Sequence, residues 1–218
     1  MIARRNLLAA PLALCAPRSA GAATPPALPI PASRKIAFRI LRNGTEVGLH
    51  TLRFAEADGS LAVSIEIDIA VKLGPFTVYH YSHRGIERWR DGRFVGMTSK
   101  TDDDGSDEYL KAAIQPEGMV VEGSQTQRYV APPGVLPTTY WNRAMVQDQL
   151  INSQDGRLFE VTVADLGRET LAQPSGEMQA QHFQLSGDLP IDLWYDAQGH
   201  WVALEFAKRG SRISYQKL

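Results

Sequence analysis

Residues 79–94, YHYSHRGIERWRDGRF, gather histidine, glutamate and arginine side chains that could carry acid–base chemistry or bind a ligand. His83 and Glu87 lie four residues apart, which on a strand separates them by roughly 13 Å, too far for a direct hydrogen bond. His80 and His83 lie three residues apart and face opposite sides of a strand, where they cannot chelate one metal. By itself the stretch therefore predicts neither a catalytic dyad nor a metal site.

Asp91-Gly92 is typical of a two-residue hairpin turn, which fixes the residues that oppose each other on its two strands. Counting from this turn predicts an aromatic pair beside it, with Trp89 opposite Phe94. A bulge at Gly85 would shift the register and invert the faces on one side of it. The same count predicts three further opposed pairs: Tyr81 with Asp102, His83 with Lys100, and His80 with Asp103.

Both faces of this ribbon are polar toward its open end, which allows two interpretations. In the first, the end projects past the core and its charges are solvated. In the second, the end rims a cavity into which Tyr81, His83, Glu87 and Trp89 point. We predict that Trp89 packs into the core near the turn, while Tyr81, His83 and Glu87 line the mouth of the sheet's concave face. His83 would be the one functional residue of a stretch that mainly builds the hairpin.

Two aromatic pairs, Tyr140-Trp141 and Trp194-Tyr195, place large amphipathic rings beside polar groups. Such rings either fill a β-sheet core or line a pocket for an apolar or planar ligand. If they line a pocket, the predicted ligand-binding residues are Tyr81, His83, Glu87, Thr101, Asp103, Tyr140, Trp141, Trp194 and Tyr195.

Signatures of catalysis and of cofactor or metal binding are absent from the sequence. It has no Gly-x-Ser-x-Gly elbow, phosphate loop or zinc helix. The acidic run 101–108 does not have the ligand spacing of an EF-hand, so a solvated turn is favoured there. We therefore expect no cofactor and no metal, and we favour a binding protein over an enzyme.

The elements that position these residues are mostly strands. From Leu61 to Val71 every second residue is apolar, which is typical of a strand with one buried face. Hairpin dipeptides such as Asn43-Gly44 recur between similar runs, and Thr138 or Thr139 could cap one short helix that includes residues 143–152. The sequence predicts an all-β, strongly curved antiparallel sheet, a β-roll or barrel-like domain of about 11–12 strands with one short inserted helix.

The N-terminus has the pattern of an export signal, with Arg4-Arg5, a short apolar run and small residues before position 22. The two arginines fit the twin-arginine route, and an ordinary secretory signal is the alternative. We predict a signal peptide over 1–22, a Pro-rich spacer over 23–33, one domain over 34–218, and a periplasmic location. Cys15, the only cysteine, would leave with the signal.

The charge balance favours neither of two classes of partner, nucleic acid and anionic membrane surfaces. The chain has 23 basic and 24 acidic residues. Removing the three arginines of the signal would leave 20 basic residues against those 24. Nothing in this balance favours nucleic acid or an anionic membrane surface, and the apolar run is too short to make an integral membrane protein.

Several short motifs, spread over nearly all of the mature chain, give the sequence a family resemblance. They are Gly48-Leu49-His50, Tyr81-Ser82-His83, residues 87–93, residues 99–105, Thr139-Tyr140-Trp141, residues 193–196, and Gly210 with Ile213 and Tyr215. With these motifs the chain resembles a proteobacterial family of exported proteins classified as a domain of unknown function, which is similar to periplasmic proteins with a rolled antiparallel sheet. The resemblance implies that fold and a periplasmic location, and it carries over no catalytic residue.

Three functions are consistent with these observations. The favoured one is binding or carrying an apolar small molecule or lipid in a concave, aromatic-lined cavity. The second is an envelope assembly protein that pairs with a partner protein through an exposed sheet edge. The third is an enzyme that uses His83 as acid or base, with Glu87 or Asp103 as its electrostatic partner.

Overall fold

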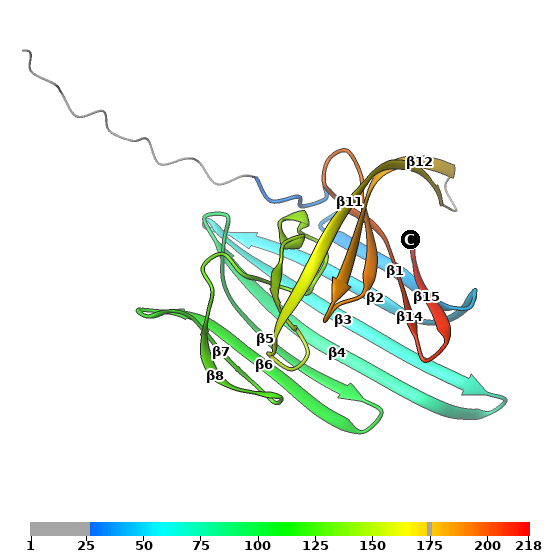
Figure 1. Ribbon diagram of the computed structural model, residues 1–218, viewed down its shortest axis with the longest axis horizontal. Helices are drawn as coiled ribbons and strands as arrows, with labels where there is room; N and C mark the ends of the chain where they lie inside the picture. The colour runs from blue at the N-terminus through cyan, green and yellow to red at the C-terminus, as the bar shows by residue number, and fades with distance from the viewer. Residues whose placement is uncertain (1–26, 174–175) are drawn as a thin grey trace, which may run out of the picture.

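A computed structural model describes residues 27–173 and 176–218, which form a single curled sheet of 15 strands (Figure 1). The sheet is a meander of antiparallel neighbours in which the first strand pairs with the last, and only β9 and β10 are parallel. β8 and β9 form its two ends and are not paired with each other in the described part, so the sheet is curled but not closed. This confirms the predicted all-β, strongly curved fold.

The strands differ greatly in length, from two residues to sixteen. In chain order they are β1 (Lys35–Arg42), β2 (Thr45–Ala57), β3 (Ser60–Leu73), β4 (Phe76–Arg90), β5 (Arg93–Asp103), β6 (Ser106–Gln115), β7 (Gly118–Gly123), β8 (Thr126–Ala131), β9 (Leu136–Pro137), β10 (Gln149–Ile151), β11 (Leu158–Gln173), β12 (Gly176–Gly187), β13 (Ile191–Tyr195), β14 (Trp201–Lys208) and β15 (Ser211–Lys217).

The period of two in the sequence determines which face of each strand is buried. In β3, Leu61, Val63 and Ile65 are buried on the concave face, and the residues between them are partly exposed. Between β4 and β5, Asp91 and Gly92 both have positive φ, +50° and +72°. Those values suit a tight hairpin whose twist matches its strands.

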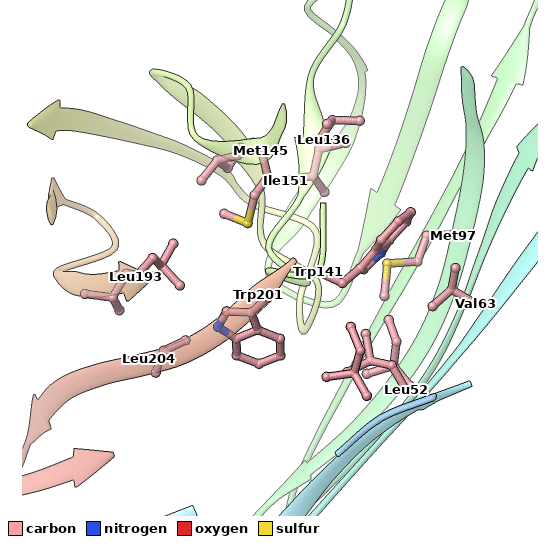
Figure 2. Packing of buried hydrophobic residues seen from close by; sticks show 14 of the residues in the cluster. Leu52, Val63, Met97, Leu136, Trp141, Met145, Ile151, Leu193, Trp201 and Leu204 are labelled. Atoms are coloured by element: carbon pink, nitrogen blue, oxygen red, sulfur yellow. The ribbon is translucent and has the colours of Figure 1, made fainter. Parts of the chain in front are cut away.

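The segment between β8 and β11 lies inside the curve of the sheet and completes the core. Figure 2 shows Trp141 from this segment facing Met97 and Val63, which lie on the sheet. Trp141 and Trp201 are both 0% exposed and lie near the centre of the packing. The concave side is therefore largely filled by the chain itself.

The predicted short helix is wrong. Residues Arg143–Met145 form one turn of 3-10 helix, η1, where the Asn142 side chain accepts a hydrogen bond from the backbone N–H of Ala144. Residues 149–151, predicted as helix, form β10, because Leu150 and Ile151 are buried in a short ladder with β11. The predicted strand number was also too low, since strands as short as β9 and β10 show no alternation.

The N-terminal predictions lie mostly outside the described residues. The signal peptide over 1–22 and the first part of the spacer cannot be compared with the structure, and export remains a prediction. Within the described part, Leu28 and Ile30 of the spacer pack against the core. None of the described helical segments has the length and apolar character needed to cross a membrane.

Candidate functional site

The hairpin at the centre of the sequence analysis has the predicted turn but a different register. Trp89 pairs with Phe94 as predicted, with ring centroids 5.5 Å apart. One residue further from the turn, a bulge places Arg88 opposite Gly96 and leaves Val95 as an extra residue on β5. A bulge had been considered only at Gly85, and its actual position shifts by one residue every pair that lies farther from the turn.

The shift makes the three other predicted pairs wrong. His83 faces Thr101 instead of Lys100, and Tyr81 faces Asp103 instead of Asp102. His80 lies opposite Asp104 instead of Asp103, since the backbone N–H of Asp104 donates to the His80 carbonyl at 2.9 Å, and the His80 Nδ1 is 3.8 Å from the Asp102 carboxylate. As a result Thr101 is on the same face as His83, and its hydroxyl oxygen is 2.8 Å from the His83 Nδ1.

The predicted open mouth is also wrong. Trp89 is 5% exposed and belongs to the core, which confirms its predicted position. Tyr81, His83 and Glu87 do lie on the concave face, but they are 7%, 2% and 0% exposed. The core and the segment inside the curve cover this face, so these three residues line no opening.

Glu87 is a buried carboxyl that contacts two indole rings inside the sheet. Its Oε2 accepts hydrogen bonds from the indole N–H of Trp89 at 2.8 Å and of Trp141 at 2.9 Å. Its Oε1 has no partner of normal geometry among the described residues, although the Thr139 side chain also faces the carboxyl. Burial raises the pKa of Glu87, and these donors oppose the rise. The carboxyl thus joins the hairpin to the segment inside the curve.

Two buried histidines lie in the same row across the sheet. Ile67 on β3 pairs with His50 on one side and with His83 on the other. Burial lowers the pKa of His50 to about 3 and that of His83 to about 4, so both rings are neutral near pH 7. His50 packs edge-on against Trp201 and Tyr215, and neither of its ring nitrogens has a hydrogen-bond partner among the described residues.

Sequence reasoning missed His50 as a buried polar residue. In the sequence analysis, His50 was used only as part of a family motif. His50, Leu52 and Phe54 are nevertheless every second residue of β2, and all three are buried on the same face. That period of two was the signal that could have found it.

Tyr140 extends the cluster around the histidines. It has a positive φ of +67°, which is uncommon for an aromatic residue and strained. This backbone turn places its ring 5.4 Å from that of Trp201, while its carbonyl accepts a hydrogen bond from the Tyr195 hydroxyl at 2.8 Å. Burial raises the pKa of Tyr140 to about 12. The cluster is therefore uncharged near neutral pH.

Two of the predicted site residues do not join this cluster. Trp194 lies on the opposite face of β13, stacks on His182 with centroids 4.3 Å apart, and donates its indole N–H to Glu169. Asp103 lies opposite Tyr81 on the same face, at its margin, and accepts a hydrogen bond from the Tyr79 hydroxyl at 2.6 Å. The structure thus places Tyr81, His83, Glu87, Thr101, Tyr140, Trp141 and Tyr195 on the concave side, with Asp103 at its margin, and separates only Trp194 from them.

An apolar cavity lies elsewhere on the described surface. A groove of about 1130 Å³ runs along the ends of β4 to β8 and the loop before β9. Arg93, Glu117 and Arg143 supply its charged groups. Its apolar wall consists of Trp89, Phe94, Ile114, Met119, Val130 and Leu136.

The groove contains none of the predicted ligand-binding residues. Trp89 connects the two regions, because its ring lines the groove while its N–H is bonded to Glu87. In the part of the chain that the structure describes, no three His, Cys, Asp or Glu side chains are grouped so as to hold a metal ion.

Comparison with known proteins agrees with this fold. Residues 38–217 match the family described as the domain of unknown function DUF6134. The chain belongs to this family. No curated protein gives a significant match. The predicted resemblance to a family of unknown function is thereby confirmed, and the proteobacterial origin and export of this DUF6134 chain remain predictions.

A solved structure gives the fold of this DUF6134 domain a counterpart. It is the crystal structure of a β-barrel-like protein of the domain of unknown function DUF1849 from Brucella abortus. The match covers 84% of this chain and 94% of that chain, with a TM-score of 0.58 and 10% sequence identity. At this identity the likeness establishes the fold alone.

Proposed function

We propose that this DUF6134 domain binds an apolar small molecule or lipid in the groove beside Trp89, and that it does so in the periplasm. The observation that carries the proposal is the volume of the groove, about 1130 Å³, together with its mainly apolar wall. Ligand sites for small molecules are concave, mostly apolar and of comparable size.

The exposure of single wall residues supports the same proposal. Ile114 is 57% exposed and Val130 is 47% exposed, although both lie in one continuous groove with Phe94 and Met119. Apolar side chains that gather in a water-filled groove are unfavourable unless something covers them. An apolar ligand would cover them without any change in the backbone.

The charges at the groove favour a ligand with one acidic end. Glu117 is paired with Arg128 at 2.8 Å. Arg93 and Arg143, by contrast, form no ion pair with the described residues, and Arg143 lies over the ring of Phe183 at 5.0 Å. An amphiphile such as a fatty acid would place its carboxylate near these arginines and its chain along the wall.

Native mass spectrometry of protein purified from the cells that make it tests the proposal. We expect a co-purifying apolar molecule that is released on denaturation. A measured mass equal to that of the polypeptide alone, together with failure to take up added fatty acid, would contradict the proposal.

A hollow at the edge of the sheet favours a second candidate function. β10 covers β11 only over Leu158–Glu160, and a hollow of about 720 Å³ lies where this cover ends, beside Val161 and Thr162. An extended segment of a partner protein could pair there by strand addition. Crosslinking in intact cells through residue 162 would capture such a partner, and capture of monomer alone would count against it.

The structure gives no support to an enzyme that uses His83. The ring is 2% exposed and its Nδ1 is engaged with Thr101. A substrate could reach this imidazole only if the core opened.

A further inference from the structure

The end of β4 farthest from the Asp91 turn extends, together with the end of β3, past the strands on either side, β2 and β5. β2 pairs with β3 only as far as Ile69, and β5 pairs with β4 only as far as Tyr81. Residues 71–79 therefore form a two-stranded ribbon in which β3 and β4 pair only with each other, as far as Leu73 opposite Phe76 (Figure 1). We call these residues the ribbon tip.

The ribbon tip is amphipathic. The pair Leu73–Phe76 continues the face that carries Ile69 and Tyr81, while Lys72 and Thr77 lie on the other face. Leu73 is 73% exposed and Phe76 is 71% exposed, the highest values among the large apolar side chains of the described residues. Val78, in the bulge of β4, is 53% exposed. Three large apolar side chains thus gather at one projecting end.

The shape of the ribbon tip favours a lipid surface over a protein partner. A stable protein interface buries roughly 800 Å² on each partner, and a convex ribbon one strand pair wide cannot supply such an area. A bilayer accepts a few apolar side chains to a shallow depth, provided that polar groups remain at its surface. Lys72 can extend its charged end toward the headgroups from the other face of the ribbon.

The charges around the ribbon tip indicate which lipid surface fits. The Arg209 guanidinium lies 5.8 Å from the centre of the Tyr79 ring, and Lys208 is 3.9 Å from the Asp103 carboxylate. Asp102, near the end of β5, and Asp104, in the turn after it, lie nearby, so the bases are balanced by acids. The contact would depend on apolar insertion and would not require an anionic bilayer.

We propose that the ribbon tip inserts Leu73, Phe76 and Val78 into the interface of a phospholipid bilayer. This goes beyond the binding function proposed above and does not depend on it. The groove begins at the opposite end of β4, and the tip can hold the domain at a lipid surface whether or not the groove is occupied.

Flotation with phosphatidylcholine vesicles tests the proposal on the full-length chain. We expect the wild type to float and Leu73→Ser/Phe76→Ser to partition at least about tenfold less, because two large side chains lose their apolar contact. The control is Leu166→Ser, since Leu166 is 54% exposed in a bulge of β11, away from the tip. All variants share the same N-terminal residues, so differences between them report on the tip.

A second variant keeps the test independent of folding defects. Phe76→Trp preserves the apolar tip, and its added fluorescence should shift to the blue when vesicles are mixed in. Ile114→Asp, a groove variant, should float like the wild type. The proposal is overturned if the double serine variant floats as well as the wild type, if Phe76→Trp shows no shift, or if the tip instead forms dimers that the double variant abolishes.

Discussion

The two ends of β4 have the same strand geometry but differ in burial, in hydrogen bonding and in the segments that cover them. Near the Asp91 turn, Trp89 is buried, and its indole N–H and that of Trp141 both bond to Glu87. At the other end, Phe76 is 71% exposed on a ribbon that neither β2 nor β5 covers. The role of a residue on β4 therefore depends on whether the segment inside the curve covers it, and not on its position in the ladder.

The two ends of β4 should also contribute differently to the stability of the domain and to its interactions with other molecules. The end with the turn holds the core together and forms one wall of the groove, so changes there should alter both properties. The ribbon tip contributes no core contact and should alter only the interactions of the domain with its surroundings. Variants at the two ends can test this separation.

The largest expected effect is on stability at the end with the turn. Trp89→Ala should lower the free energy of unfolding by about 3–5 kcal/mol, because it leaves a cavity and removes one of the two indole donors to Glu87. Phe76→Ala should change it by less than about 0.5 kcal/mol. Urea denaturation measures both. Equal losses at the two positions would show that the two ends of β4 contribute alike to stability.

The next effect is a pH dependence from the middle of the sheet. The unfolded chain protonates its histidines near pH 6.5, whereas the folded protein keeps His50 and His83 neutral down to about pH 3 and 4. The unfolded state therefore gains protons first, and stability falls with pH below 6.5. Between pH 7 and pH 4.5, each histidine should lower the free energy of unfolding by about 2–3 kcal/mol.

His50→Phe isolates this contribution. The new ring keeps the edge contacts with Trp201 and Tyr215 and has no titrating group, so about half of the acid loss due to the two histidines should disappear. Urea titrations at both pH values measure the difference. An unchanged acid loss in the variant would show that His50 is not held neutral.

The smallest effect on stability comes from Glu87 and has the opposite sign. Burial raises its pKa above the usual 4.5, so the folded protein binds this proton more tightly than the unfolded chain. The contribution of Glu87 to the free energy of unfolding is present at low pH and falls as the pH rises through its raised pKa. Glu87→Gln stays neutral and can still accept from both indoles. Its stability relative to the wild type should therefore grow from pH 4.5 to 8, as thermal unfolding would show, and a constant difference would contradict the raised pKa.

The fold could be predicted from the sequence to the extent that it rests on local alternation. The strict period of two from Leu61 to Val71 and the Asp91-Gly92 turn led to a curved antiparallel sheet and to the Trp89–Phe94 pair. The bulge between Arg88 and Trp89 was not predicted, although Gly96, which lies opposite Arg88 and directly after the extra residue Val95, was a local sign of it. That single extra residue on β5 changed every later partner of β4.

The candidate site was less predictable because it depends on long-range coverage. Nothing local shows that the segment around Trp141 fills the concave side, so His83 was expected at an opening and is instead buried. The groove wall joins residues as far apart in sequence as Trp89, Ile114 and Leu136. Only the curl of the sheet brings these side chains together.

Binding of an apolar ligand in the groove is tested most directly by a fluorescence titration with an uncharged apolar probe, N-phenyl-1-naphthylamine, followed by displacement with a fatty acid. Ile114→Asp/Val130→Asp places two carboxylates in the groove at exposed positions that should leave the fold intact. Leu166→Asp is the matched control outside the groove. We expect the wild type and the control to bind the probe and release it to the fatty acid, and the double variant to bind at least about tenfold more weakly. Equal binding by all three proteins would contradict the assignment of the groove as the binding site.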